Sequence, residues 1–222
     1  MLEDVLLITE KHANAAKKIV HRINKPTINK FIIAIGGESG SGKSEVAHMV
    51  GKLLKKENNP AKIIHTDNYY KTLPENRTAL RKKMGMESVG LSEYKWELIQ
   101  QHLNDFKQNK KSTLPCIDLI SDQVDKLMTN FNGINILILE GLYSLGADAD
   151  LKILIDLTYH ETKKAQILRG KERVDEFRYK ILQREHEAVQ SLRQTADLLI
   201  TKEFDVVDAN TVPVQGVKAP KR

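Results

Sequence analysis

The chain has 222 residues, of which 41% are hydrophobic and 29% charged. This length suits one domain with a small insertion, and the composition excludes a disordered tail or a collagen-like chain. The formal net charge of +6 favours an anionic partner, which leaves open nucleic acid, a membrane surface and a polyphosphate ligand.

The first expected element is helical. Apolar residues between positions 2 and 23 recur at helical spacing, and Pro26 ends the segment, which predicts one or two helices. We therefore expect residues 1–29 to form an N-terminal helical extension. The run Phe31 to Ile35 is short, β-branched and followed by glycines, the pattern of a buried strand that ends in a turn. Residues 46–54 then show one apolar helical face.

The rest of the chain alternates between the two kinds of element. Apolar runs predict strands at residues 62–66, 134–139, 151–157 and 197–200, and a further short strand at 205–207. Helical patterns cover residues 93–106, 161–168 and 174–192. This alternation predicts an α/β fold with a mostly parallel sheet covered by helices on both faces. The domain would span residues 30–208, followed by a short tail at 209–222.

A phosphate-binding motif lies between the first strand and the following helix. Residues 37–44 match the pattern G-x-x-x-x-G-K-[ST] in full and in the context that the pattern requires. The glycines let backbone N–H groups converge on phosphate oxygens, and the helix adds the positive end of its dipole. Lys43 would hold the β- and γ-phosphates, and the Ser44 hydroxyl would ligate Mg²⁺. The predicted nucleotide-binding residues are Gly37, Glu38, Ser39, Gly40, Ser41, Gly42, Lys43 and Ser44.

Switch GTPases, ATPases and small-molecule kinases all use such a loop. The N-K-x-D motif that reads guanine is absent, and the strand at 134–139 ends in the single acidic residue Glu140 instead of an Asp-Glu pair. Asp67 ends the second strand, at the sheet edge that carries the phosphate loop. There it would accept the proton of an acceptor hydroxyl and contact Mg²⁺ through water, although an Asx turn or helix cap is the alternative. A single acidic residue at Glu140 and a separate candidate base at Asp67 favour a kinase over a GTPase or an ATPase.

Four segments carry a resemblance to a known family. They are residues 36–44, Asp67-Asn68-Tyr69-Tyr70-Lys71, Ile138-Leu139-Glu140-Gly141-Leu142-Tyr143 and Ala196-Asp197-Leu198-Leu199-Ile200. In this order they resemble the uridine kinase and phosphoribulokinase family of P-loop kinases, over about residues 30–207. The resemblance implies a five-stranded parallel sheet, ATP with Mg²⁺, and transfer to a primary alcohol. The resemblance also implies that Asp67 is catalytic, that Ser44 and Glu140 belong to the metal site, and that Tyr70 lines the acceptor site.

The acceptor motifs depart from the family pattern. Ser92 stands where uridine kinases carry an aspartate that grips the ribose, and Ile117 replaces a tyrosine that faces the base. Glu93 and Glu87 are candidates to replace the lost carboxylate, or else solvated residues. A nucleoside therefore leads as the acceptor, with a sugar phosphate, glycerate or a pantothenate-like alcohol as alternatives.

Each of two basic segments has two interpretations: its side chains bind an anion, or they face solvent. Residues 168–180 match the place of an arginine-bearing lid in this family. Arg169 and Arg173 are four residues apart and would both point at the γ-phosphoryl group, or else form a solvated charged face. The run that begins at Arg77 and ends at Lys83 would receive an anionic acceptor, with Arg77 as its candidate contact, or would face solvent.

A second function class is an NTP-binding regulator or a nucleic-acid-stimulated ATPase. The missing guanine motif, the lone Glu140 and the lack of a basic-aromatic cluster argue against it and against a nucleic-acid partner. The single cysteine, Cys116, excludes an internal disulfide. The longest apolar runs are far too short for a membrane span and no signal peptide is recognisable, so we expect a cytoplasmic location. A homo-oligomer is compatible with the sequence.

Overall fold

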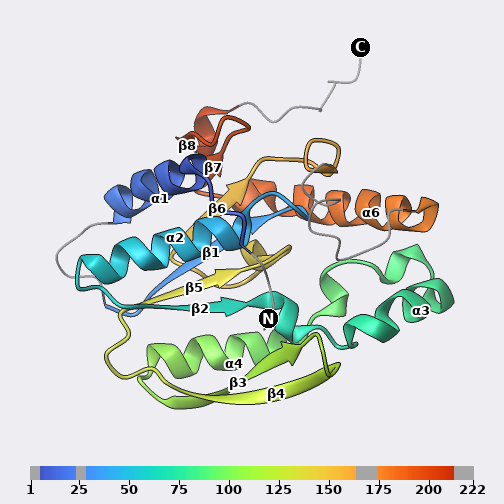
Figure 1. Ribbon diagram of the computed structural model, residues 1–222, viewed down its shortest axis with the longest axis horizontal. Coiled ribbons are helices and arrows are strands. Elements are labelled where there is room, and N and C mark those ends of the chain that lie inside the picture. Colours follow the sequence, from blue (N-terminus) through green and yellow to red (C-terminus); the bar gives the residue numbers. More distant parts are fainter. Residues whose placement is uncertain (1–5, 24–28, 164–174, 213–222) are drawn as a thin grey trace, which may run out of the picture.

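The computed structural model describes residues 6–23, 29–163 and 175–212 (Figure 1). Within these residues six strands form the main sheet, in the order β2-β5-β1-β6-β7-β8. They are β1 (Phe31–Gly37), β2 (Ala61–His65), β5 (Ile136–Glu140), β6 (Leu151–Ile155), β7 (Leu198–Ile200) and β8 (Val206–Asp208). The first five in this order run parallel, and β8 pairs antiparallel with β7. The predicted α/β fold is confirmed, with one antiparallel edge strand more than the five parallel strands implied by the family resemblance.

The register of the central strands brings the ends of three of them together. Ile35 of β1 is opposite Glu140 of β5, and Glu140 is opposite His65 of β2. In a parallel sheet the residues that follow such a row emerge at one edge. The phosphate loop after β1 and the turns after β2 and β5 therefore share that edge of the sheet.

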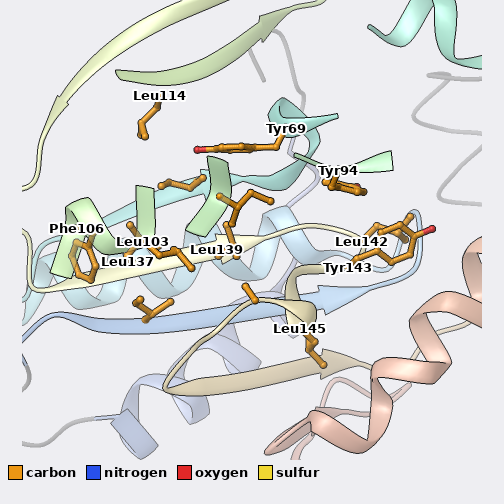
Figure 2. Close-up of a cluster of buried hydrophobic side chains, with 14 of the residues drawn as sticks. Tyr69, Tyr94, Leu103, Phe106, Leu114, Leu137, Leu139, Leu142, Tyr143 and Leu145 are labelled. Carbon is orange, nitrogen blue, oxygen red and sulfur yellow. The ribbon is translucent and has the colours of Figure 1, made fainter. Parts of the chain in front are cut away.

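Five helices of the described residues accompany the strands: α1 (Glu10–Ile23), α2 (Lys43–Lys56), α3 (Pro74–Met84), α4 (Trp96–Lys107) and α6 (Glu176–Leu192). Successive strand residues point to opposite faces, which produces two separate cores. On one face α1 and α2 pack on Ile33 and Ile35. On the other face Ile32 lies in a cluster with Phe106 of α4 and Val189 of α6, part of which Figure 2 shows.

Helix α1 packs closely against α2 and the sheet. Its core-facing residues, all at most 4% exposed, are Ala15, Ala16, Ile19, Val20 and Ile23. Two exposed ion pairs, Lys18 with Asp205 and Arg22 with Asp208, join it to the β7–β8 region. Exposed pairs of this kind contribute little, so burial of the apolar face holds α1 in place.

One hairpin and one helix of the structure were not predicted from the sequence. Strands β3 (Lys111–Asp118) and β4 (Gln123–Asn130) pair antiparallel apart from the main sheet. In β3 alternate residues such as Leu114 and Cys116 are buried, which is a strand signal, but β4 is exposed along almost its whole length and lacks one. Helix α3 buries a single residue, Arg81, so it has no apolar stripe to detect.

The boundaries of two predicted helices change in the structure. Helix α4 begins at Trp96 because a 3₁₀ turn at Leu91–Glu93 and an extended Tyr94 precede it. Helix α6 begins at Glu176, where the Asp175 side chain accepts the Arg178 N–H at 2.8 Å. The predicted helix at 161–168 and the predicted tail lie largely outside the described residues. Within the described part of the chain, no helix combines the length and apolar character that crossing a membrane needs.

Candidate active site

The phosphate loop joins β1 to α2 and has a compact backbone. Gly42 caps α2 with φ of 93°, and a Cβ at this position would lie 2.7 Å from His12 Nε2 of α1. Both the left-handed backbone and the close approach require glycine here. Within the loop, the Ser41 N–H and the Lys43 ammonium both donate to the Glu38 carbonyl, at 3.2 and 2.9 Å. Lys43 therefore folds over the loop, where it can meet a phosphate.

Ser44, Glu140 and His65 meet beside this loop. The Ser44 hydroxyl donates to Glu140 Oε1 at 3.3 Å, and His65 Nδ1 hydrogen-bonds the same oxygen. Glu140 is only 5% exposed. Burial raises the pKa of Glu140, but the His65 hydrogen bond, the nearby charges of His65 and Lys43, and the Ser44 hydroxyl outweigh burial and lower it below its usual range. Glu140 is therefore an ionised carboxylate at neutral pH.

The donors at this corner suit magnesium. Mg²⁺ prefers oxygen ligands, keeps several waters and is commonly held by one or two carboxylates together with substrate phosphates. Glu140 supplies a carboxylate and Ser44 a hydroxyl beside the phosphate loop. No group of three or more His, Cys, Asp or Glu side chains suited to a metal occurs in the described ranges. These residues fit an ion shared with a nucleotide better than an all-protein metal site.

Asp67 lies in a 3₁₀ turn, Thr66–Tyr69, directly after β2. Its Oδ1 accepts a hydrogen bond from the Tyr94 hydroxyl at 3.3 Å, and His65, not Asp67, occupies the capping position of the turn. A Cβ on Gly141 would lie 1.8 Å from Thr66 Oγ1, so this turn and the one after β5 are in close contact. Asp67, in the turn after β2, and Glu140, the last residue of β5, thus lie at the same edge of the sheet.

An aromatic wall continues from Asp67. The Tyr70 and Tyr94 rings have centroids 4.2 Å apart, and the Arg77 guanidinium lies 3.5 Å above the Tyr70 ring. Both tyrosines are nearly buried. Burial raises the pKa of each phenol above its ordinary value. They are therefore neutral, and Tyr94 acts toward Asp67 as a hydrogen-bond donor.

Behind this wall lies a buried ion-pair network. Arg81 Nε and Nη2 donate to the two carboxylate oxygens of Glu93 at 2.8 and 2.9 Å, and Nη2 lies 3.5 Å from Glu185 Oε1. Burial lowers the pKa of Arg81, but its bonds to Glu93 and the charge of Glu185 raise it overall. Glu93 is thus the partner of a buried arginine, while Glu87 is exposed. The basic run splits, with Arg81 inside and Lys83 outside.

The two positions that depart from the family pattern have different surroundings. Ile117 on β3 is 1% exposed, and its N–H donates to Asn68 Oδ1 at 3.0 Å. This contact joins the hairpin to the turn that carries Asp67. Ser92 is exposed and donates to the Ser88 carbonyl at 3.4 Å. The main chain of Ile117 therefore lies next to Asn68, the residue that follows Asp67 in the sequence.

The predicted lid arginines, Arg169 and Arg173, lie outside the described residues. Several contacts were not foreseen from the sequence, and they involve His65, Tyr94, Tyr159 and His186. His65 could have been inferred, because it is the last residue of a predicted strand on the edge that carries Asp67. His186 had no such signal: its partner Glu38 is 148 positions away in the chain.

The chain is similar to known proteins both as a member of a family and in individual sequences. The model of the phosphoribulokinase/uridine kinase family matches residues 32–169. Uridine kinase from Mycoplasma pneumoniae is 29% identical over 182 residues, which cover 77% of this chain and 84% of that protein. Uridine kinase from Ureaplasma parvum is 30% identical over 149 residues, covering 64% and 70%.

Solved structures show the same fold at lower identity. A structure described as a possible uridine kinase from Bacillus stearothermophilus has a TM-score of 0.60 at 17% identity, covering 84% of this chain and 97% of the other. Phosphoribulokinase from Rhodobacter spheroides has a TM-score of 0.61 at 14% identity, covering 79% and 71%. These likenesses concern the arrangement of the strands and helices.

Proposed function

The chain belongs to the phosphoribulokinase/uridine kinase family of ATP-dependent small-molecule kinases, and on this premise we propose that it transfers the γ-phosphoryl group of ATP, with Mg²⁺, to an alcohol. The leading acceptor is a nucleoside. The hypothesis of a non-kinase regulator or a nucleic-acid-stimulated ATPase is set aside, because it does not agree with the family.

The observation that carries the proposal is the position of Glu140. This carboxylate accepts the Ser44 hydroxyl at 3.3 Å on one side, and its strand pairs with the strand that leads into Asp67 on the other. A metal held by Ser44 and Glu140 would lie between the nucleotide phosphates and the acceptor. That is where negative charge builds up during phosphoryl transfer.

The side chains divide the reaction between them. Lys43 and the loop amides bind the β- and γ-phosphates, and bound Mg²⁺ would offset their negative charge. The acceptor oxygen attacks the γ-phosphorus while the bond from phosphorus to the β,γ-bridging oxygen breaks, and ADP leaves. Asp67 takes the proton of the acceptor hydroxyl, and the Tyr94 hydroxyl orients Asp67. We assign Arg169 and Arg173, in a lid at 168–180, to the γ-phosphoryl charge.

Two features bear on the acceptor. The relatives named uridine kinase support a nucleoside, and we assign Tyr70, three residues after Asp67, to the lining of the acceptor site. Arg77 above the Tyr70 ring favours a second candidate, an anionic acceptor such as a sugar phosphate. Glycerate and pantothenate-like alcohols are further candidate acceptors.

The test is the release of ADP from MgATP by the full chain, measured with a panel of nucleosides, sugar phosphates, glycerate, pantothenate, DNA and RNA. We expect stimulation by a nucleoside and a phosphorylated product detected by mass spectrometry. Stimulation by a sugar phosphate alone would keep the kinase and change the acceptor. Stimulation by nucleic acid alone would contradict the proposal.

A further inference from the structure

The phosphate loop contains a buried carboxylate. Glu38 directly follows Gly37 in a loop whose task is to bind an anion, and it is only 2% exposed. A buried charge needs compensating partners. A carboxylate that turned toward the phosphates would also repel them. The orientation of Glu38 is therefore decisive for the loop.

Both carboxylate oxygens of Glu38 have partners outside the loop. Oε1 accepts a hydrogen bond from His186 Nδ1 of α6 at 2.6 Å, and Oε2 accepts the Tyr159 N–H at 2.5 Å. Tyr159 follows β6, and its ring lies edge-on to His186 with centroids 5.8 Å apart. The neighbouring Ser39 carbonyl accepts the Thr162 hydroxyl at 2.8 Å. These contacts direct the carboxylate toward α6 and the turn after β6.

Lys43 contacts the main chain of Glu38. The Lys43 ammonium donates to the Glu38 carbonyl at 2.9 Å, so a cation lies beside the main chain of the residue that carries the carboxylate. A Glu38 side chain released from α6 could turn toward this ammonium. A carboxylate and a phosphate would then compete for the same lysine.

The helix that holds Glu38 is itself anchored. Glu185, next to His186, contacts Arg81 of α3 and Arg178 at 3.5 and 3.4 Å, and it is 4% exposed. Leu182 and Val189 of α6 are buried as well. His186 thus extends toward the loop from a helix whose inner face is fixed.

We propose that His186 is a positioning residue for phosphate binding, which holds the Glu38 carboxylate away from Lys43 so that the ammonium meets the nucleotide instead. This inference rests on the proposed function, because it takes the loop to bind ATP. On this inference the backbone of Glu38 belongs to the phosphate loop, whereas the Glu38 carboxylate has to be held away from Lys43.

The test is binding of MgAMPPNP, a non-hydrolysable ATP analogue, to the full chain by titration calorimetry. His186→Ala should weaken binding about tenfold or more, the usual effect of losing one charge-assisted hydrogen bond. His186→Asn should bind within about threefold of wild type, because its amide nitrogen can take the place of Nδ1. Glu38→Ala removes the competing carboxylate and supplies the background for the double variant, and its own affinity is measured alongside.

The deciding variant combines the two changes. Glu38→Ala with His186→Ala should bind MgAMPPNP more tightly than His186→Ala alone, whereas a merely structural role for His186 predicts no recovery. Glu187→Ala is the matched control, since Glu187 lies on the same helix and pairs only with Arg184 at the surface in the described structure. Thermal unfolding of each variant checks the fold.

The outcomes separate this inference from the proposed function. Wild-type affinity in His186→Ala, or no recovery in the double variant, overturns the positioning role and leaves the kinase intact. If His186→Ala does not fold, His186→Phe, which keeps a ring but has no hydrogen-bond donor, takes its place, and wild-type affinity in that variant overturns the inference. A wild-type chain that does not bind MgAMPPNP overturns both.

Discussion

The phosphate side and the acceptor side of the site are built in different ways. On the phosphate side the loop between β1 and α2 presents backbone groups. Lys43 and Ser44 at the start of α2 and Glu140 at the end of β5 complete it with side chains. On the acceptor side Tyr70 and Tyr94 stack in front of the buried pair of Arg81 and Glu93.

This difference agrees with the motifs at which the sequence departs from the family resemblance. A backbone cradle needs glycines and one lysine at fixed spacing, so its sequence has little freedom. A wall of packed side chains can be rebuilt with other residues of suitable volume and charge. The family resemblance predicts that the changes at Ser92 and Ile117 belong to the acceptor side, whereas the phosphate motif is complete.

The largest expected effect lies where the two sides meet, at Asp67. Asp67→Asn should lower kcat by about 10²- to 10⁴-fold, because the amide cannot accept the acceptor's proton. The dissociation constant for MgATP should change little. Steady-state kinetics with the acceptor that the panel identifies, together with calorimetry, measures both. Asp125→Asn, on the exposed strand β4, is the matched control, and unchanged turnover in Asp67→Asn would remove the assigned base.

The next effect concerns stability on the acceptor side. Arg81→Ala leaves Glu93 and Glu185 without this buried arginine and should lower the free energy of unfolding by about 3 to 5 kcal/mol. Urea unfolding monitored by circular dichroism measures this change. Lys83→Ala on the exposed face of α3 should stay within about 0.5 kcal/mol of wild type. Equal stability of the two variants would show that the network contributes nothing.

The smallest effect distinguishes the classes of acceptor. Arg77→Ala removes a cation from above the Tyr70 ring, a contact worth about 0.5 to 1 kcal/mol at a partly exposed site. With a neutral nucleoside the acceptor KM should rise roughly two- to fivefold and the KM for ATP should not change. With an anionic acceptor the rise should exceed tenfold, since a charged hydrogen bond is lost. Asn76→Ala, the exposed neighbour, controls for changes in α3.

The sequence predicted the elements that short-range signals define. Phe31 to Ile35, the loop at 37–44 and the apolar face of α2 are contiguous, so composition and spacing were enough to find them. Asp67 and Glu140 were found because each ends a recognisable strand. Their catalytic and metal roles stay predictions, as do the division of the chain into extension, domain and tail, the cytoplasmic location and the oligomeric state.

Other elements carried no readable signal. Strand β4 is exposed nearly throughout, so it has no alternation of apolar and polar residues. Helix α3 is polar, and its one buried side chain is charged. A charged residue in a basic run gives no indication that it points inward, because its partner, Glu93 or Glu185, is decided by the packing of distant segments.

The sequence by itself determined that the chain handles a nucleotide phosphate, because a phosphate cradle is made by a few consecutive residues whose backbone geometry depends on their identity. Only the tertiary structure decided which side chains share the site. It set His65 and Ser44 on the carboxylate of Glu140, Tyr94 on Asp67, and His186 on Glu38. These contacts join residues between 27 and 148 positions apart. Their geometry follows from sheet register and helix packing, which no short stretch of sequence specifies.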